Sequence, residues 1–233
     1  QGLWSKAEEL EVKVLERSKA ILGEDHPETL TSMANLANTY WNQGLWSKAE
    51  ELEVKVLERS KAILGEDHPH TLTSMENLAI TYQYEGLWPK AEELEVKVLE
   101  RRKAILGEDH PETLTSMANL ASTYQYQGLW PKAEELQVKV LERCKATLGE
   151  DHPDTLSSMA NLASTYRNQG LWPKAEELEV KALERSKAIL GEDHPDTLSS
   201  MANLANTYRN QGLWPKAEEI EVKVLERRKA ILH

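Results

Sequence analysis

The chain has 233 residues, of which 40% are hydrophobic and 29% are charged, and its formal net charge is −11 at pH 7. The negative charge is spread along the chain without a basic cluster, which argues against nucleic acid and against an anionic membrane surface as partners. No apolar run reaches the ~18 residues of a membrane-spanning helix, and Cys144 is the only cysteine, so the composition predicts a soluble cytoplasmic protein without an intrachain disulfide.

A strict internal repeat of 42 residues organises the whole chain. Every copy opens on a glycine, and no insertion or deletion separates the copies. The opening residues are Gly2, Gly44, Gly86, Gly128, Gly170 and Gly212. The chain therefore holds five full repeats and the first half of a sixth. A fixed period in this range indicates an array in which each repeat buries its apolar face against its neighbours, so we expect residues 1–233 to form one array.

The first half of each repeat has the pattern of an amphipathic helix, which we call helix B. In the fifth repeat it extends from Leu171 to Leu190, and its two neighbouring apolar stripes require two packing partners. We assign the glutamates of helix B to the opposite, solvated face. Gly191 is expected to end the helix in the left-handed conformation. The tryptophans expected to lie largely buried between helix layers are Trp46, Trp88, Trp130 and Trp172.

The second half of each repeat predicts another helix, helix A. In the fifth repeat it extends from Pro195 to Gln211, because proline suits the first position of a helix and Gly212 breaks it. Its apolar stripe consists of Leu198, Met201, Leu204, Ala205 and Tyr208. The connections are only a few residues long, so neighbouring helices must be antiparallel. The sequence thus predicts an all-α chain of eleven helices that starts and ends with a helix B.

The combination of Leu204-Ala205, Tyr208, Gly212, Trp214 and Ala217 resembles the tetratricopeptide signature. The usual tetratricopeptide unit has about 34 residues, so each helix here has about one extra turn. The LGEDHP linker and the NLA segment resemble the repeats of kinesin light chains and, more closely, the near-identical C-terminal arrays of fungal NOD-like receptor proteins. This resemblance covers the whole chain and implies a right-handed α-solenoid, a superhelix of antiparallel helix pairs.

Differences between the repeats gather on one arc of helix A, opposite its apolar stripe. The substitutions that stand out on this arc are Glu76, Trp41, Ile80, Tyr84, Tyr126, Arg167 and Arg209. Drift of any solvated face is one explanation, although the solvated face of helix B hardly varies. The resemblance offers another, because the exposed stripe of helix A lines the concave groove in which tetratricopeptide arrays hold their ligands.

One asparagine in the same arc is identical in every repeat. It is found at Asn35, Asn77, Asn119, Asn161 and Asn203. Each amide offers an acceptor and two donors, so a ladder of these side chains is suited to clamp the backbone of an extended peptide. Packing between successive A helices explains the invariance equally well. With Trp41, Ile80, Tyr84 and Tyr126 in the first half of the groove and Arg167 and Arg209 in the second, our hypothesis is a peptide with an apolar anchor and an acidic group.

No pattern of residues indicates catalysis, a cofactor or a metal. The repeated histidines, from His26 to His194, lie a full repeat apart and cannot converge on one ion, so we expect a structural role for them in the linkers. Cys144 takes the place of Arg102 and Arg228 in other repeats, so we interpret it as an incidental, partly exposed thiol. No helix A contains a lysine, which argues against the carboxylate clamp of chaperone-binding tetratricopeptide proteins.

The sequence therefore predicts a non-enzymatic module that binds a protein or peptide in the groove of the A helices, as part of a larger protein. The alternative is a structural spacer or self-associating rod without a dedicated ligand, which the near-identity of the repeats favours. Neither terminal helix B has the polar outer face of a capping repeat, so we also expect weak head-to-tail self-association.

Overall fold

The computed structural model describes residues 2–231, and the side chains of residues 6–230. Eleven α-helices and no strand occur in this part of the chain. They are α1 (Gly2–Leu22), α2 (Pro27–Asn42), α3 (Trp46–Leu64), α4 (Pro69–Tyr84), α5 (Trp88–Leu106), α6 (Pro111–Tyr126), α7 (Trp130–Leu148), α8 (Pro153–Asn168), α9 (Trp172–Leu190), α10 (Pro195–Asn210) and α11 (Trp214–Ile231). The odd-numbered helices are the B helices and the even-numbered ones the A helices, which confirms the predicted all-α fold.

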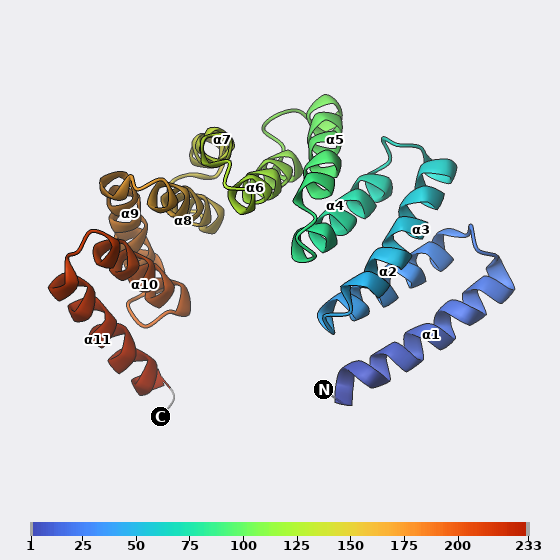
Figure 1. The fold of residues 1–233 in the computed structure, drawn as a ribbon, viewed down its shortest axis with the longest axis horizontal. Helices are drawn as coiled ribbons and strands as arrows, with labels where there is room; N and C mark the ends of the chain where they lie inside the picture. Colours follow the sequence, from blue (N-terminus) through green and yellow to red (C-terminus); the bar gives the residue numbers. More distant parts are fainter. Residues whose placement is uncertain (1, 232–233) are drawn as a thin grey trace. The chain divides into compact units, whose positions relative to one another are not determined.

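The helices form two compact units, unit 1 (Gln1–Glu108) and unit 2 (Asp109–His233), which we describe separately. Within each unit, helices that are consecutive in the chain pack side by side as antiparallel neighbours, as Figure 1 shows for α2 and α3 in unit 1 and for α8 and α9 in unit 2. This is the arrangement of an α-solenoid, in which every helix buries its apolar stripe against the helices before and after it.

The repeated histidines act as N-caps of the A helices. The Nδ1 atom of His110 accepts a hydrogen bond from the backbone N–H of Glu112 at 3.2 Å, and Pro111 occupies the first helical position. The same bond recurs at His26, His68, His152 and His194. Each cap satisfies one of the N–H groups that the first turn of a helix leaves without a partner. The histidines therefore have the structural role that their spacing predicts.

The A helices and the B helices end at glycines with different backbone conformations. At the end of α4, Leu87 N–H donates to the Tyr82 carbonyl and Gly86 N–H to the Gln83 carbonyl, which together form a Schellman motif around Gly86 at φ +74°. At the end of α9, however, Gly191 has φ 87° and ψ 166°. The expected left-handed stop at Gly191 is therefore wrong, because the backbone enters the linker in an extended form that only glycine adopts readily.

The linkers are attached to the helix that lies one repeat further on. Arg101 of α5 donates to Asp67 at 2.7 Å and to Glu66 at 2.9 Å, both in the linker before α4. Equivalent pairs join Arg59 to Glu24 and Asp25, and Arg185 to Glu150 and Asp151. These exposed pairs contribute little to stability individually, but they explain why Glu-Asp recurs in every linker.

Alanine, not tryptophan, is the fully buried residue in the first turn of the B helices. Ala91, Ala133 and Ala175 are fully buried, three residues after the tryptophan that begins each B helix. Trp46 and Trp172 are 37% and 38% exposed, and Trp88 and Trp130 are half-buried. The expectation of largely buried tryptophans is therefore wrong. At the first position of the helix the indole covers the rim of the pair, while the core lies one turn further along.

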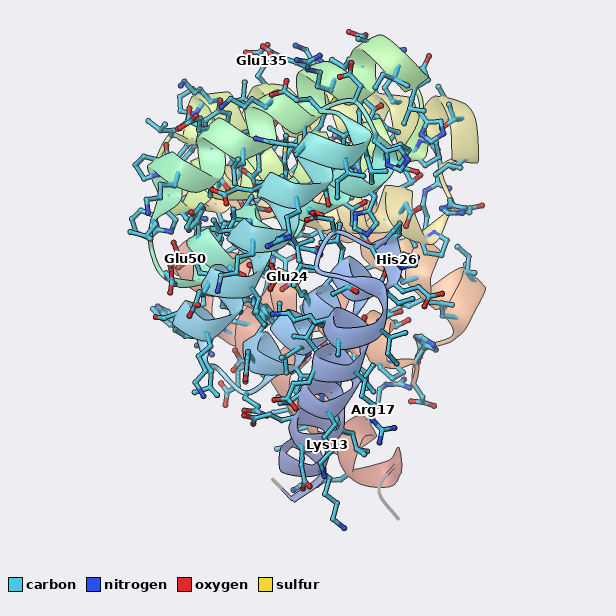
Figure 2. The ribbon with its side chains drawn as sticks, turned by 90° about the vertical axis from the view of Figure 1, so that its right-hand side faces the viewer. Lys13, Arg17, Glu24, His26, Glu50 and Glu135 are labelled. Carbon is cyan, nitrogen blue, oxygen red and sulfur yellow. The ribbon has the colours of Figure 1, made fainter. Side chains whose placement is uncertain are left out.

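The outer faces of the B helices carry charged side chains, as expected. Glu177 and Lys181 of α9 form an i,i+4 pair at 2.6 Å, and Glu135 and Lys139 of α7 repeat it at 2.7 Å. Figure 2 shows Glu135 directed away from the helices. None of the helices in residues 2–231 combines the length and the apolarity that crossing a bilayer requires.

Candidate functional site

The invariant asparagines lie on the accessible side of the A helices. Asn35, Asn77 and Asn161 are exposed, and Asn119 and Asn203 are half-buried. Within residues 2–231 none of their side-chain amides forms a hydrogen bond with another part of the protein. Their donors and acceptors are therefore available to a ligand, as a backbone clamp requires.

A cavity of about 350 Å³ in unit 1 brings several of the candidate residues together. It lies between α2 and α4, and a residue from the middle of α3 also lines it. Its walls are formed by Ala34, Asn35, Asn38, Trp41, Glu53, Asn77 and Ile80. Four of these, namely Asn35, Asn77, Trp41 and Ile80, belong to the predicted groove. The cavity thus joins two amides of the ladder to an aromatic and an aliphatic side chain.

Aromatic side chains extend this cavity along α4. The rings of Trp41 and Tyr84 meet edge to face with their centroids 4.9 Å apart, and Trp46 lies 6.0 Å from Tyr84. Tyr84 is itself exposed, so the cluster presents a rigid apolar surface beside the amides. Tyr126 is also exposed, but it belongs to α6 in unit 2 and is not part of this cluster.

The two arginines of the predicted groove are already paired within unit 2. Arg167 Nη1 donates to Glu179 Oε1 at 2.6 Å and to the Asn203 carbonyl at 3.2 Å, and its side chain is mostly buried. Arg209 pairs with Glu221 in the same way at a more exposed position. Because a glutamate of the chain compensates each guanidinium, this arrangement argues against an acidic group of the ligand at either arginine.

The glutamates that pair with these arginines correct the assignment of helix B glutamates to a solvated face. Glu53, Glu95 and Glu179 occupy one equivalent position of helix B and are buried, and Gln137 is buried at the same position in α7. This position faces the preceding helix A, because residues twelve apart meet where the two helices pack. The sequence pattern did not predict the burial of this acid, because the acid recurs among the other charged residues of helix B. The only signal was the variation of its partner on helix A.

The partner on the preceding helix A differs between repeats. Gln83 Nε2 donates to Glu95 Oε1 at 2.8 Å, whereas Gln137 Oε1 accepts from Thr165 Oγ1 at 2.5 Å, a threonine of the following helix A that is identical in every repeat. Arg167 supplies a full positive charge to Glu179. Groove substitutions on helix A therefore change the partner of a buried acid as well as the surface.

Glu53 is the member of this series that faces Trp41. Its Oε2 atom is buried and has no hydrogen-bond partner in the described part of the chain, as is also true of Glu95 Oε2 and Glu179 Oε2, and of Trp41 Nε1. Burial raises the pKa of Glu53, and the negative charges of Glu50 and Glu85 raise it further. The Thr81 hydroxyl lowers it in part, without a hydrogen bond of good geometry between the two side chains. Unlike Glu179, Glu53 has no arginine beside it that lowers its pKa.

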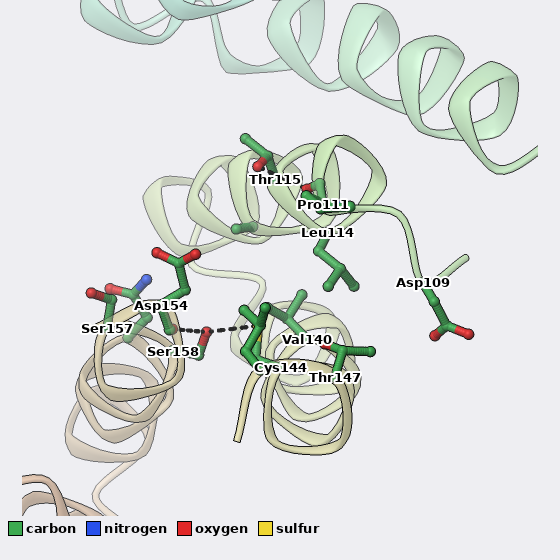
Figure 3. Close-up of a pocket in the computed structure, with 13 residues that line it drawn as sticks. Asp109, Pro111, Leu114, Thr115, Val140, Cys144, Thr147, Asp154, Ser157 and Ser158 are labelled. Atoms are coloured by element: carbon green, nitrogen blue, oxygen red, sulfur yellow. Dashed lines mark hydrogen bonds between the residues drawn. The ribbon is translucent and has the colours of Figure 1, made fainter. Parts of the chain in front are cut away.

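A second variable contact explains the difference between Arg102 and Cys144. In unit 1, Arg102 of α5 is buried and donates to both carboxylate oxygens of Glu76 in α4, at 2.5 and 2.8 Å. The equivalent residues in unit 2 are the small side chains Ala118 and Cys144, which leave a cavity of about 330 Å³ between α6, α7 and α8. Figure 3 shows this cavity.

Cys144 is therefore buried, with 4% of its surface exposed, and its expected partial exposure is wrong. Arginine replaces it in α5 because Glu76 neutralises the buried charge there, so that replacement was no sign of exposure. Burial also raises the pKa of the Cys144 thiol, against a smaller opposing effect of the Ser158 hydroxyl 3.8 Å from the sulfur. A thiol with a raised pKa has little thiolate character, so this cysteine is poorly suited to nucleophilic chemistry. Among the described residues, no three His, Cys, Asp or Glu side chains gather where they could share a metal ion.

The tetratricopeptide repeat family model matches residues 1–28, 29–70, 71–112, 117–188 and 160–230. No curated protein sequence matches the chain. A structure of a kinesin light chain-type protein from Podospora anserina, with nearly identical tetratricopeptide-like repeats, is 32% identical over 88% of this chain and 98% of its own, with a TM-score of 0.79.

Two more distant structures share the fold. A signal transduction ATPase (STAND) protein from Pyrococcus horikoshii with a tetratricopeptide repeat sensor is 19% identical, with a TM-score of 0.77 over 100% of this chain and 34% of its own. NprR, a quorum sensor from B. thuringiensis, in complex with its cognate peptide NprX, is 17% identical, with a TM-score of 0.62 over 93% of this chain and 61% of its own.

Proposed function

Because the chain belongs to the tetratricopeptide repeat family, we propose that it is a non-enzymatic interaction module that binds an extended peptide segment of a cytoplasmic partner along its A helices. The observation that carries this proposal is the cavity of unit 1, where Asn35 and Asn77 stand beside Trp41 and Ile80. Amides bind the backbone of a peptide in any sequence, whereas the apolar walls select a side chain.

Two further observations support a peptide as the ligand. The five asparagine amides form no hydrogen bond with the described part of the protein, although they recur at every repeat. Tyr84 and Trp41 form a rigid aromatic surface next to them, and aromatic residues are frequent binding hot spots. NprR, which has the same fold, is a peptide-binding example among the structural relatives.

The test is the selection of peptides from a random displayed library on the intact chain, followed by binding measurements on variants. We expect Asn35→Ala/Asn77→Ala and Tyr84→Ala each to weaken the selected peptides by about tenfold or more, because each removes contacts of a hot-spot cluster. Lys55→Ala, on the outer face of α3, is the matched control and should bind unchanged. Selected peptides that bind the groove variants as tightly as the original chain would show that the groove is not the site.

Self-association is the second candidate function, and the terminal helices favour it. Leu225 of α11 is 54% exposed, whereas the equivalent Leu183 of α9 is 8% exposed. On α1, Val14 is exposed, whereas its counterpart Val56 of α3 is buried. Each of these faces exposes an apolar side chain whose internal equivalent is buried, so the two faces are suited to meet each other head to tail.

Sedimentation equilibrium of the chain is expected to show weak, concentration-dependent association. Leu225→Glu should reduce it, because the charge replaces apolar surface at the contact. Ile105→Glu, at an equally exposed apolar position of the internal helix α5, should leave it unchanged. A strict monomer at high concentration, or equal effects of the two substitutions, would contradict head-to-tail contacts.

A further inference from the structure

One repeat of this protein shows which kind of group the buried acid of helix B binds. In unit 2, Arg167 places one guanidinium nitrogen between the Glu179 carboxylate and the Asn203 carbonyl, at 2.6 and 3.2 Å. This contact shows that a guanidinium fits between the consecutive A helices α8 and α10 while it donates to the acid of α9. It also shows which two acceptors such a group meets.

In unit 1 the same acceptors are present, but the arginine is absent. Glu53 is equivalent to Glu179 and Asn77 to Asn203, while Trp41 stands where Arg167 stands. Glu53 is 8% exposed and lines the cavity of about 350 Å³, and its Oε2 atom has no partner in the described residues. Glu179 has the Arg167 guanidinium at 2.6 Å, whereas no Lys or Arg of the described residues pairs with Glu53. A buried carboxylate without a compensating charge is costly, so a cation that reaches it gains more than it would at the surface.

The charges around Glu53 favour a cation in this cavity. Glu50 and Glu85 add to the negative potential at its carboxylate, and the neighbouring Thr81 is uncharged. Trp41 forms part of the wall, and indole is the aromatic group that attracts a cation most strongly. Asn35 adds an amide oxygen on the same wall, which can accept a hydrogen bond from a group rich in donors, whereas Asn38 Oδ1 already accepts from Asn42 Nδ2 at 3.2 Å.

We propose that the cavity formed by Trp41, Glu53 and Asn77 binds a positively charged side chain of the peptide ligand, with arginine as the best fit. The guanidinium pairs with the Glu53 carboxylate and donates to the backbone carbonyl of Asn77. Arg167 makes the same two contacts with the Glu179 carboxylate and the backbone carbonyl of Asn203. Its flat face lies against the Trp41 indole. Lysine offers the same charge without the planar fork of donors, so it binds more weakly.

This inference rests on the proposed function, since it names the side chain that the groove selects. Glu11 of α1 is also equivalent and also has a buried Oε2 atom without a partner, but no helix A of the described residues precedes it to form a cavity. The equivalent residues that follow an A helix are already supplied from within the chain or carry no charge: Glu179 and Glu221 have arginines, Gln83 donates to Glu95, and Gln137 is uncharged. Among the positions that follow an A helix, the preference for a cation is therefore confined to the cavity at Glu53.

Fluorine NMR of the intact chain labelled with 5-fluorotryptophan tests the inference. The chain has seven tryptophans, and Trp41→Gln removes one resonance and so assigns it. The probes are the peptide acetyl-Ala-Ala-Arg-Ala-Ala-amide and its versions with lysine and with citrulline, a neutral isostere of arginine. We expect the arginine peptide to shift the Trp41 resonance saturably, with a Kd at least about tenfold lower than that of the citrulline peptide.

Two substitutions copied from other repeats provide matched variants that are expected to fold. Glu53→Gln installs the residue found at Gln137, and Trp41→Arg installs the residue found at Arg167. With Glu53→Gln, the arginine and citrulline peptides should bind equally. With Trp41→Arg, the internal guanidinium fills the site. A fluorescently labelled copy of the arginine peptide should therefore no longer bind. Circular dichroism checks the fold of both variants.

The outcomes separate this inference from the proposed function. Equal binding of the arginine and citrulline peptides to the original chain, or an arginine preference that survives Glu53→Gln, would overturn the cation site. If peptides from the random library still depend on Asn35 and Asn77 in that case, peptide binding in the groove stands without a cation. If they do not, the proposed function fails independently.

Discussion

Glu76→Ala is expected to lower the free energy of unfolding by about 3–5 kcal/mol, although glutamate is unique to this repeat and alanine is the usual residue. The reason is Arg102, which is 4% exposed and donates to both carboxylate oxygens of Glu76. Removing one partner of a buried ion pair leaves the other charge in a medium of low dielectric constant without the opposite charge that stabilised it. Chemical denaturation monitored by circular dichroism measures the loss.

The control for this prediction is the double substitution Glu76→Ala/Arg102→Ser. It recreates the pair that other repeats hold at Ala34 and Ser60, or at Ala160 and Ser186. Because no charge is then buried, the double variant should recover most of the stability that the single variant loses. A single variant as stable as the original chain, or a double variant less stable than the single one, would show that Arg102 does not depend on Glu76.

Met159→Ala is expected to cost about 2–5 kcal/mol, because Met159 is 1% exposed and packs with Leu141, Leu162 and Ala182 between α7, α8 and α9. Trp172→Ala removes a larger side chain in the same part of unit 2, yet it should cost less, since the indole lies at the rim. Neighbouring helices share each core layer in a repeat array, so the loss should spread to α7 and α9.

Hydrogen exchange resolved by helix distinguishes these two effects. Faster exchange in α7, α8 and α9 is expected for Met159→Ala, and a smaller change near the start of α9 for Trp172→Ala. A larger and wider effect of Trp172→Ala would place the tryptophan in the core and contradict the burial that the structure shows.

The sequence by itself determined the helices of this protein and their ends. A 42-residue period without gaps fixed the number of repeats, and proline after histidine marked the start of each helix A. These features are local, because a cap or a Schellman motif involves residues only a few positions apart. The predicted helix A from Pro195 to Gln211 differs from the observed α10 by one residue for that reason.

Only the tertiary structure decided which charged residues are buried. Glu53 and Glu177 both look like surface glutamates in a helical pattern, but Glu53 lies against α2 and Glu177 pairs with Lys181 in solvent. Likewise, the pairing of Glu76 with Arg102 joins residues 26 positions apart. The helical pattern determines the angular position of a residue on its own helix. It does not determine how far around that helix the contact with the neighbouring helix extends. Burial of the acid, and with it the candidate cation site, therefore depends on how the helices pack.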